Sequence, residues 1–145
     1  MKFAEFLKLK NDNKGSTIIE FAITAPVLLL LLFGMFEFSR VLFTQGILSY
    51  SAEQGTRFAM VNFDHDNLDP DYINAIKSDI EDVSRNSFIL VNDTNISNFD
   101  VEVVTNADNT STVNITIDYD YKMSLPLIPH FDFTLTGSSK SFLVQ

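Results

Sequence analysis

Residues 14–44 read KGSTIIEFAITAPVLLLLLFGMFEFSRVLFT, and this stretch decides how the chain is organised. From Phe21 to Phe36 it contains no charged residue. As a helix, this uncharged run extends roughly 24 Å, which is slightly less than a hydrocarbon core of about 30 Å. Including Ile18, Ile19 and residues 38–43 closes the gap if the two flanking glutamates, Glu20 and Glu37, lie near the membrane interfaces or have partners. The stretch therefore predicts a membrane-inserted helix rather than a buried helix of a soluble domain.

A cleaved secretory peptide is the alternative interpretation of this run. Such a peptide has an apolar core of about 7–15 residues, followed by a cleavage site of small residues. Here the run is longer, and residues 37–43, EFSRVLF, continue it as a helix-forming stretch. We therefore expect the helix to be retained. Pro26 removes one backbone hydrogen bond, but membrane helices tolerate proline, so we expect a local bend or a place where the helix partly unwinds during assembly.

Charge is distributed unevenly along the 145 residues, whose formal net charge is −9. Residues 1–15 carry four lysines against two acids, giving +2, and the remaining 6 bases and 17 acids give −11 to residues 16–145. Because basic residues before a membrane span stay on the cytoplasmic side, we expect a cytoplasmic N-terminus and an acidic domain outside. An acidic domain repels nucleic acid, so no DNA or RNA partner is expected. The chain has no cysteine, which excludes disulfides and cysteine-based zinc or thiol chemistry.

The residues after the apolar run predict a small α+β domain. We expect one long helix over residues 17–61, apolar all round in its first half and amphipathic in its second. A polar loop over residues 62–71 contains Asp69, which is suited to cap a second helix over residues 70–86. From residue 99 the apolar period changes to two, which predicts three or four antiparallel strands, with an interruption at Gly137. The two helices are expected to cover the apolar face of this sheet.

Several of these residues carry a resemblance to a known family. The chain resembles the TadE-like minor pilins, or pseudopilins, of bacterial tight-adherence (Flp-type) pilus systems. The likeness rests on Lys14-Gly15, Glu20-Phe21, Pro26 with its leucine run, FGMFEFSR at residues 33–40 and AEQGTRFA at residues 52–59. It covers residues 14–61 well, and LPLIP at residues 125–129 with residues 134–142 less specifically. A pilin-like fold is implied, with a basic leader at 1–15, a long helix at 16–61 that spans the membrane with its first half, and an extracytoplasmic α+β domain at 62–145.

The resemblance also implies processing by a prepilin peptidase, an aspartyl membrane protease. Cleavage would fall between Gly15 and Ser16, making Ser16 the new N-terminus and Glu20 its fifth residue. A free α-amine in the interface and a carboxylate in apolar surroundings are each costly alone. Glu20, next to Phe21, is therefore expected to pair with the Ser16 amine of its own or a neighbouring subunit during assembly. The simpler alternative is that Glu20 only marks the membrane boundary.

The leading hypothesis is a minor pilin that takes part in assembling a tight-adherence pilus, and so in cell adhesion. Its expected partners are the prepilin peptidase, the major pilin, a sister minor pilin, the inner-membrane assembly platform and membrane lipid. We expect Pro26, Gly34, Glu37 and Arg40 at helix interfaces, with Glu37 and Arg40 able to form an ion pair because they are three residues apart. The expected location is the bacterial inner membrane, as a single-pass protein, or the pilus and cell surface after assembly.

An uncleaved bitopic membrane protein is the alternative hypothesis, with an outer domain that binds a ligand or a surface. It predicts that the mature protein keeps residues 1–15 and that Glu20→Ala changes little. The pilin hypothesis predicts that Glu20→Ala abolishes assembly and that a bulky or charged residue at Gly15 blocks processing.

Other candidate sites carry weaker signals. Asp64, Asp66 and Asp69 lie in an oxygen-rich loop, and calcium prefers six to eight oxygen ligands. The loop lacks the glycine and the terminal glutamate of an EF-hand, so a solvated loop with a helix cap is favoured. His65 and His130 are the only histidines and have no partnering motif. There is no GxSxG, HExxH or phosphate-binding glycine loop, so we expect neither an enzyme nor a cofactor.

Overall fold

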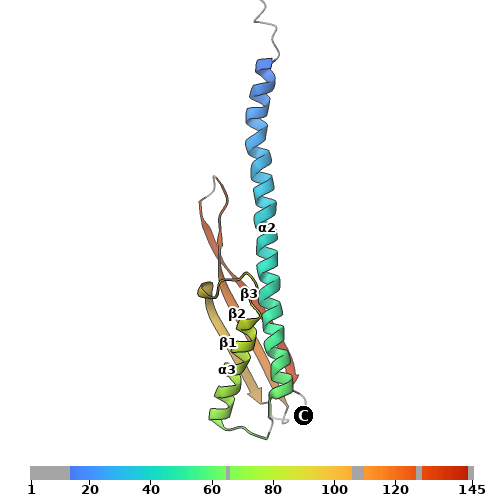
Figure 1. The fold of residues 1–145 in the computed structure, drawn as a ribbon, viewed down its shortest axis with the longest axis vertical. Coiled ribbons are helices and arrows are strands. Elements are labelled where there is room, and N and C mark those ends of the chain that lie inside the picture. The colour runs from blue at the N-terminus through green and yellow to red at the C-terminus, as the bar shows by residue number, and fades with distance from the viewer. Residues whose placement is uncertain (1–13, 65, 106–109, 127–128, 144–145) are drawn as a thin grey trace, which may run out of the picture.

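The computed structural model describes residues 14–64, 66–105, 110–126 and 129–143 of the chain. It consists of a long helix, α2 (Lys14–Asn62), and a smaller unit that packs against the C-terminal half of that helix (Figure 1). The smaller unit contains helix α3 (Pro70–Asn86), the short 3-10 turn η2 (Asp93–Asn95) and strands β1 (Ile96–Thr105), β2 (Ser111–Met123) and β3 (Phe131–Leu143). The α+β class with one long helix, a second helix and an antiparallel sheet is confirmed, and the described strands number three.

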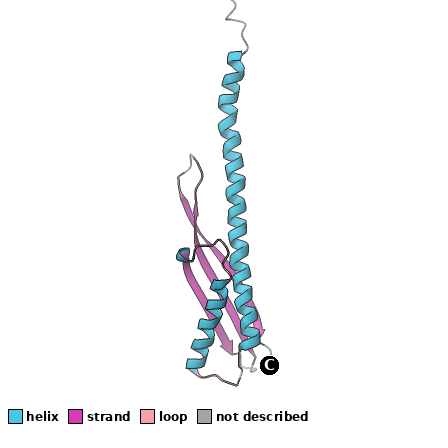
Figure 2. Ribbon diagram, viewed as in Figure 1, coloured by secondary structure: helices cyan, strands magenta, loops and turns pink. Residues whose placement is uncertain are grey.

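Helix α2 is continuous over its 49 residues, which corresponds to a length of roughly 74 Å. It begins at Lys14, three residues before the expected start, and Pro26 lies inside it without ending it. Figure 2 shows that the N-terminal half of α2 extends well beyond the sheet and α3. The second helix has the expected bounds, and Asp69 caps it by accepting a hydrogen bond from the Asp71 backbone N–H at 2.9 Å.

The sheet has the strand order β1-β2-β3, and both pairings are antiparallel. Side chains of β2 alternate between a buried face, which includes Ile115 and Ile117, and a face with Asp118 and Asp120 that is half-buried or exposed. Because α2 packs on β2 and β3 while α3 contacts β1, the two helices together cover the apolar face. The core therefore lies between the C-terminal half of α2, helix α3 and one face of the sheet. It is formed by Leu48, Ala52, Ala59, Phe63, Ile76, Ile80, Val101, Val113, Ile115, Ile117, Tyr119, Tyr121, Leu135 and Leu143.

Two glycines allow the helices to lie this close to the sheet. The expected interruption at Gly137 is wrong, because β3 runs through it in register with Ile117. A Cβ at Gly137 would lie 2.5 Å from both the carbonyl carbon and the Cβ of Leu48. A Cβ at Gly55 would overlap the Oγ of Ser84 and lie 2.8 Å from the Cδ1 of Ile115. Gly137 thus permits contact between α2 and β3, and Gly55 permits contact of α2 with α3 and β2.

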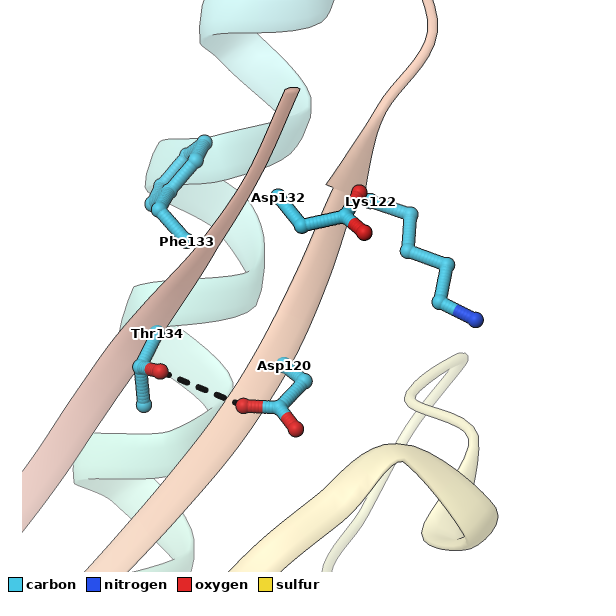
Figure 3. A pocket seen from close by; sticks show the side chains of 5 residues that line it. All are labelled: Asp120, Lys122, Asp132, Phe133 and Thr134. Carbon is cyan, nitrogen blue, oxygen red and sulfur yellow. Dashed lines mark hydrogen bonds between the residues drawn. The ribbon is translucent and has the colours of Figure 1, made fainter. Parts of the chain in front are cut away.

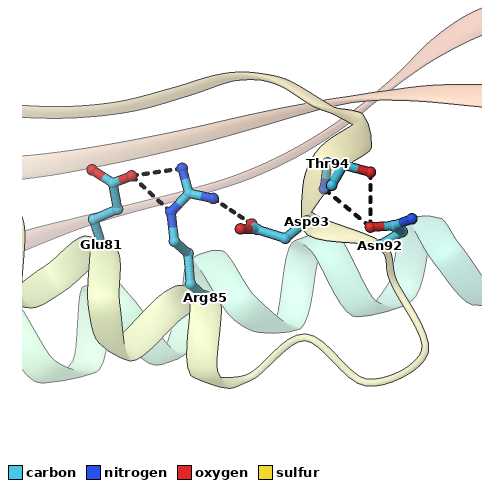
Figure 4. A network of polar contacts seen from close by, with 5 residues as sticks. All are labelled: Glu81, Arg85, Asn92, Asp93 and Thr94. Atoms are coloured by element: carbon cyan, nitrogen blue, oxygen red, sulfur yellow. Dashed lines mark hydrogen bonds and ion pairs between the residues drawn. The ribbon is translucent and has the colours of Figure 1, made fainter.

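Arg85 joins α3 to the segment that leads into the sheet (Figure 4). Its Nη2 lies 2.6 Å from the Oε1 of Glu81, and its Nη1 forms an ion pair with Asp93. The guanidinium carbon also lies 5.0 Å from the centroid of the Phe99 ring. Partial burial alone lowers the pKa of Arg85, but the hydrogen bonds to Glu81 and Asp93 outweigh it and raise that pKa. The Glu81–Arg85 pair is therefore part of a network between three elements rather than an isolated surface pair.

Ser51, fully buried on α2, has a side-chain oxygen with no hydrogen-bond partner among the described residues. Because a buried hydroxyl without a partner is costly and alanine favours helix more than serine does, Ser51→Ala should raise the free energy of unfolding by about 1 kcal/mol. Thermal unfolding of the detergent-solubilised chain, followed by circular dichroism, measures the change. Ser84→Ala is the matched control, since the equally buried Ser84 Oγ donates to the Ile80 carbonyl oxygen at 2.9 Å. A Tm that falls in Ser51→Ala would contradict the expectation.

Candidate functional site

The N-terminal half of α2 exposes an apolar surface that no other described element covers. An 18-residue window of this helix has a mean hydropathy of 2.3, and none of that window is buried. Soluble monomers rarely expose contiguous apolar patches of more than a few hundred Å². The helix is long and apolar enough to cross a membrane and lies near the N-terminus, which is consistent with membrane anchoring. Its exposed large apolar residues before the domain are Ile18, Ile19, Phe21, Ile23, Val27, Leu28, Leu29, Leu31, Leu32, Phe33, Met35, Phe36 and Phe38.

The predicted cleavage bond, Gly15–Ser16, lies in the first turn of α2. The Oγ of Ser16 donates to the Oε1 of Glu20 at 3.4 Å, one helical turn further on, and both side chains are exposed. A Cβ at Gly15 would meet no heavy atom of the described chain within 4 Å. Packing within the subunit therefore does not require glycine at this position. The predicted pairing of Glu20 with a free Ser16 amine concerns a chain cut after Gly15 and stays a prediction.

Further along the apolar half, Pro26 and Phe21 are exposed and Gly34 is half-buried. A Cβ at Gly34 would also meet no heavy atom of the described residues within 4 Å. Contacts within the described subunit thus do not explain why glycine stands at position 34 or proline at position 26. Their predicted place at interfaces with other helices remains a prediction.

Glu37 lies where the apolar half of α2 meets the folded domain, and it is only 3% exposed. Its Oε2 accepts a hydrogen bond from the Nη1 of Arg40 at 2.8 Å. Its Oε1 accepts one from the Tyr121 hydroxyl at 3.0 Å and one from the Ser124 backbone N–H at 3.3 Å. The carboxylate therefore has a partner on each oxygen, which offsets the cost of its burial. These contacts join α2 to the end of β2.

The hydrogen bond to Glu37 places Tyr121 in a buried site beside charged groups. Its side chain is buried, and the Arg40 guanidinium carbon lies 5.7 Å from its ring centroid. Burial, and then the hydrogen bond to Glu37 and the charge of that carboxylate, raise the pKa of Tyr121 to about 12. Sequence reasoning found the Glu37–Arg40 pair from its spacing but missed Tyr121 and Ser124, which follow Glu37 by 84 and 87 residues. Only the inward position of Tyr121 in the alternating run of β2 hinted at this contact.

The acidic loop between the two helices uses its carboxylates for local hydrogen bonds. Asp64 Oδ1 accepts from the Asp66 backbone N–H at 3.0 Å, and Asp69 serves as the cap of α3. The hydroxyl of Tyr72 also accepts from the backbone N–H of Asp64, at 2.6 Å. Among the described residues no group of three or more acidic or histidine side chains is placed to hold a metal ion. His130 is exposed, and His65 lies outside the described residues.

An open pocket of about 320 Å³ lies near the turning end of β2 and β3 (Figure 3). Its described lining consists of Asp120, Lys122, Asp132, Phe133 and Thr134. Thr134 donates to Asp120 at 3.2 Å, and Figure 3 shows the Lys122 ammonium pointing away from both carboxylates. The lining thus combines two acids and one separated base on the solvent side of the sheet, and we assign no ligand to it.

Comparison with protein families gives one match. The family model described as TadE-like protein matches residues 15–57, which comprise most of α2 and include Glu20, Pro26 and Glu37. Comparison with curated proteins and with solved structures gives no match. The TadE-like match suggests a protein associated with the Tad pilus, in a family that is pilin-like and generally non-enzymatic.

Proposed function

We propose, on the premise that residues 15–57 form a TadE-like domain, that the protein is a minor pilin or pseudopilin that takes part in assembling a tight-adherence pilus. The observation that carries the proposal is the division of α2 into two halves. The N-terminal half is apolar and exposed, and the C-terminal half packs against the sheet and α3. The exposed half of such a helix can exchange its contacts with lipid for contacts with other apolar helices, while the domain on the other half stays folded.

Before assembly, the exposed N-terminal half of α2 spans the inner membrane, with the N-terminus in the cytoplasm and the acidic domain outside. The basic head and the hydropathy of α2 support this orientation. In the assembly complex, the same surface packs against the major pilin and a sister minor pilin. The prepilin peptidase and the inner-membrane assembly platform are the remaining partners of this proposal.

Cleavage after Gly15 would place a new charged amine at Ser16, one helical turn before Glu20. The positive charge of that amine would add to the positive end of the helix dipole, and both favour a carboxylate near the start of the helix. The Ser16 and Glu20 side chains already lie within 3.4 Å of each other. This proximity supports a pairing of the amine and the carboxylate within the cut subunit or between neighbouring subunits.

The N-terminal residue of the mature protein tests the proposal. We expect the intact mass of the membrane-bound protein to correspond to a chain starting at Ser16 when the cognate prepilin peptidase is present, and to the full chain when it is absent. A full-length mass in both strains would contradict the proposal and favour the uncleaved bitopic protein.

Gly15→Leu is expected to block this processing and leave the full-length mass even with the peptidase present. A bulky side chain at the residue before the cut interferes with the protease and not with the fold, because a Cβ at Gly15 meets nothing within 4 Å in the described subunit. Gly34→Leu is the matched control, since it lies on the same helix with the same free space around its Cβ. Normal processing of Gly15→Leu, or equal loss in both variants, would argue against a cleavage site at Gly15.

A further inference from the structure

The C-terminal end of β2 and the N-terminal end of β3 lie near the level where the exposed apolar half of α2 begins. Figure 1 shows these two strand ends extending beyond the rest of the domain, towards the N-terminal end of α2. The Tyr121 and Ser124 contacts with Glu37 hold that end against α2. The hairpin is therefore attached at a defined height on the helix.

That height is the end of the uncharged run. Glu37 is the first charged residue after residues 21–36, so it marks where α2 leaves the hydrocarbon in the proposed function. Met123 and Phe131 pair with each other two residues beyond Tyr121, which places them up to about 7 Å closer to the apolar half. A domain held at Glu37 thus brings this end of the hairpin to the level of the outer membrane interface.

The residues at this end have the chemistry of an interface segment. Phe131 is 61% exposed, although its ring continues the row formed by Phe133 and Tyr121, with centroid distances of 5.9 Å and 5.4 Å along the row. Two of the turn residues, Pro126 and Pro129, have no backbone N–H, which reduces the number of unpaired donors that would have to leave water. Phenylalanine is one of the apolar residues that segments lying in a membrane interface bury at the boundary between head groups and acyl chains.

We propose that the end of this hairpin inserts into the outer interface of the same bilayer that α2 crosses. We name it the hairpin foot and define it by its described residues, 123–126 and 129–131. The proposal rests on the membrane insertion of α2 in the proposed function. With two points of attachment, the foot and the helix, the domain takes up one orientation over the membrane. Glu37 then lies between the helix and the foot, shielded from both lipid and water.

Because the chain has no cysteine, single-cysteine variants of the full chain give unique probe positions. Phe131→Cys and Phe142→Cys form a matched pair, since both phenylalanines are on β3 and are 61% and 65% exposed. Phe142 pairs with Thr112 at the other end of the hairpin. Leu125→Cys adds a second position in the foot, and Val27→Cys reports the insertion of α2 itself.

Each variant is labelled with a small environment-sensitive fluorophore and reconstituted at low protein density in phosphatidylethanolamine–phosphatidylglycerol vesicles. Lipids with a spin label at a shallow acyl position then quench the fluorophores. We expect loss of most fluorescence at residues 131 and 125, and little loss at residue 142. If residues 131 and 125 are quenched no more strongly than residue 142, while a deep spin label quenches residue 27, then α2 is in the membrane and the proposed insertion of the hairpin foot is wrong. An unquenched residue 27 would overturn the membrane insertion and the foot together.

Discussion

Gly137→Ala is expected to lower the free energy of unfolding by about 1–3 kcal/mol, the usual cost of an inserted methyl group in a close-packed contact, or more. The added Cβ would lie 2.5 Å from the Leu48 carbonyl carbon and 2.7 Å from the Ser49 backbone nitrogen. These are backbone atoms in the middle of α2, so they cannot move aside as the end of a side chain could. The strand and the helix would have to separate along the contact that covers β3. Denaturant unfolding of the detergent-solubilised chain, followed by circular dichroism, measures the loss.

Gly46→Ala is the control for this substitution. Gly46 lies on α2 near the same contact, but a Cβ there would meet no heavy atom of the described residues within 4 Å. Since glycine inside a helix is less stable than alanine by about 0.5–1 kcal/mol, Gly46→Ala should raise stability. The same chemical change is thus expected to act in opposite directions at the two positions. Equal stability of the two alanine variants would show that α2 and β3 are not in close contact at Gly137.

Glu37→Ala is expected to have the second large effect, because it removes the acceptor of three hydrogen bonds at once. The Tyr121 hydroxyl would remain buried without its partner, at a cost of about 1–3 kcal/mol. Arg40 and the Ser124 backbone N–H lose their acceptor as well. We expect the hairpin end to detach from α2, which limited proteolysis within residues 124–130 would detect as faster cutting. Denaturant unfolding gives the accompanying loss of stability.

Two further variants separate this contact from a general effect of substitution. The double variant Glu37→Ala with Tyr121→Phe no longer has the buried hydroxyl that lacks a partner. It should therefore be more stable than expected from adding the effects of the two single substitutions. Because folding raises the pKa of Tyr121 from 10.0 to about 12, its contribution to stability is present below pH 10 and is lost as the pH rises towards 12. Tyr121→Phe should show less of this alkaline loss than the unmodified chain. Purely additive effects of the two substitutions would contradict a direct contact between Glu37 and Tyr121.

Much of the fold can be predicted because it depends on residues close together in the sequence. The bounds of α3 follow from Asp69, Pro70 and an apolar period of 3.6, and the structure reproduces them. The alternation in β2 likewise indicates which of its faces is buried. Gly137 shows the opposite case. In the sequence, a glycine within an alternating strand pattern predicts an interruption of the strand. In the fold, Gly137 is the residue that allows Leu48 to lie against β3.

The candidate site divides in the same way. Residues 14–44 by themselves determine the uncharged run, the position of Glu20 directly before it and the end of the run at Glu37, since these are properties of consecutive residues. What Glu37 does inside the subunit was decided only by the tertiary structure. Its partner Tyr121 is 84 residues away and reaches it because the strand register and the packing of β3 on α2 set the height of the hairpin. Neither that register nor that packing is a local property, because each depends on which apolar faces are buried together when the whole chain folds.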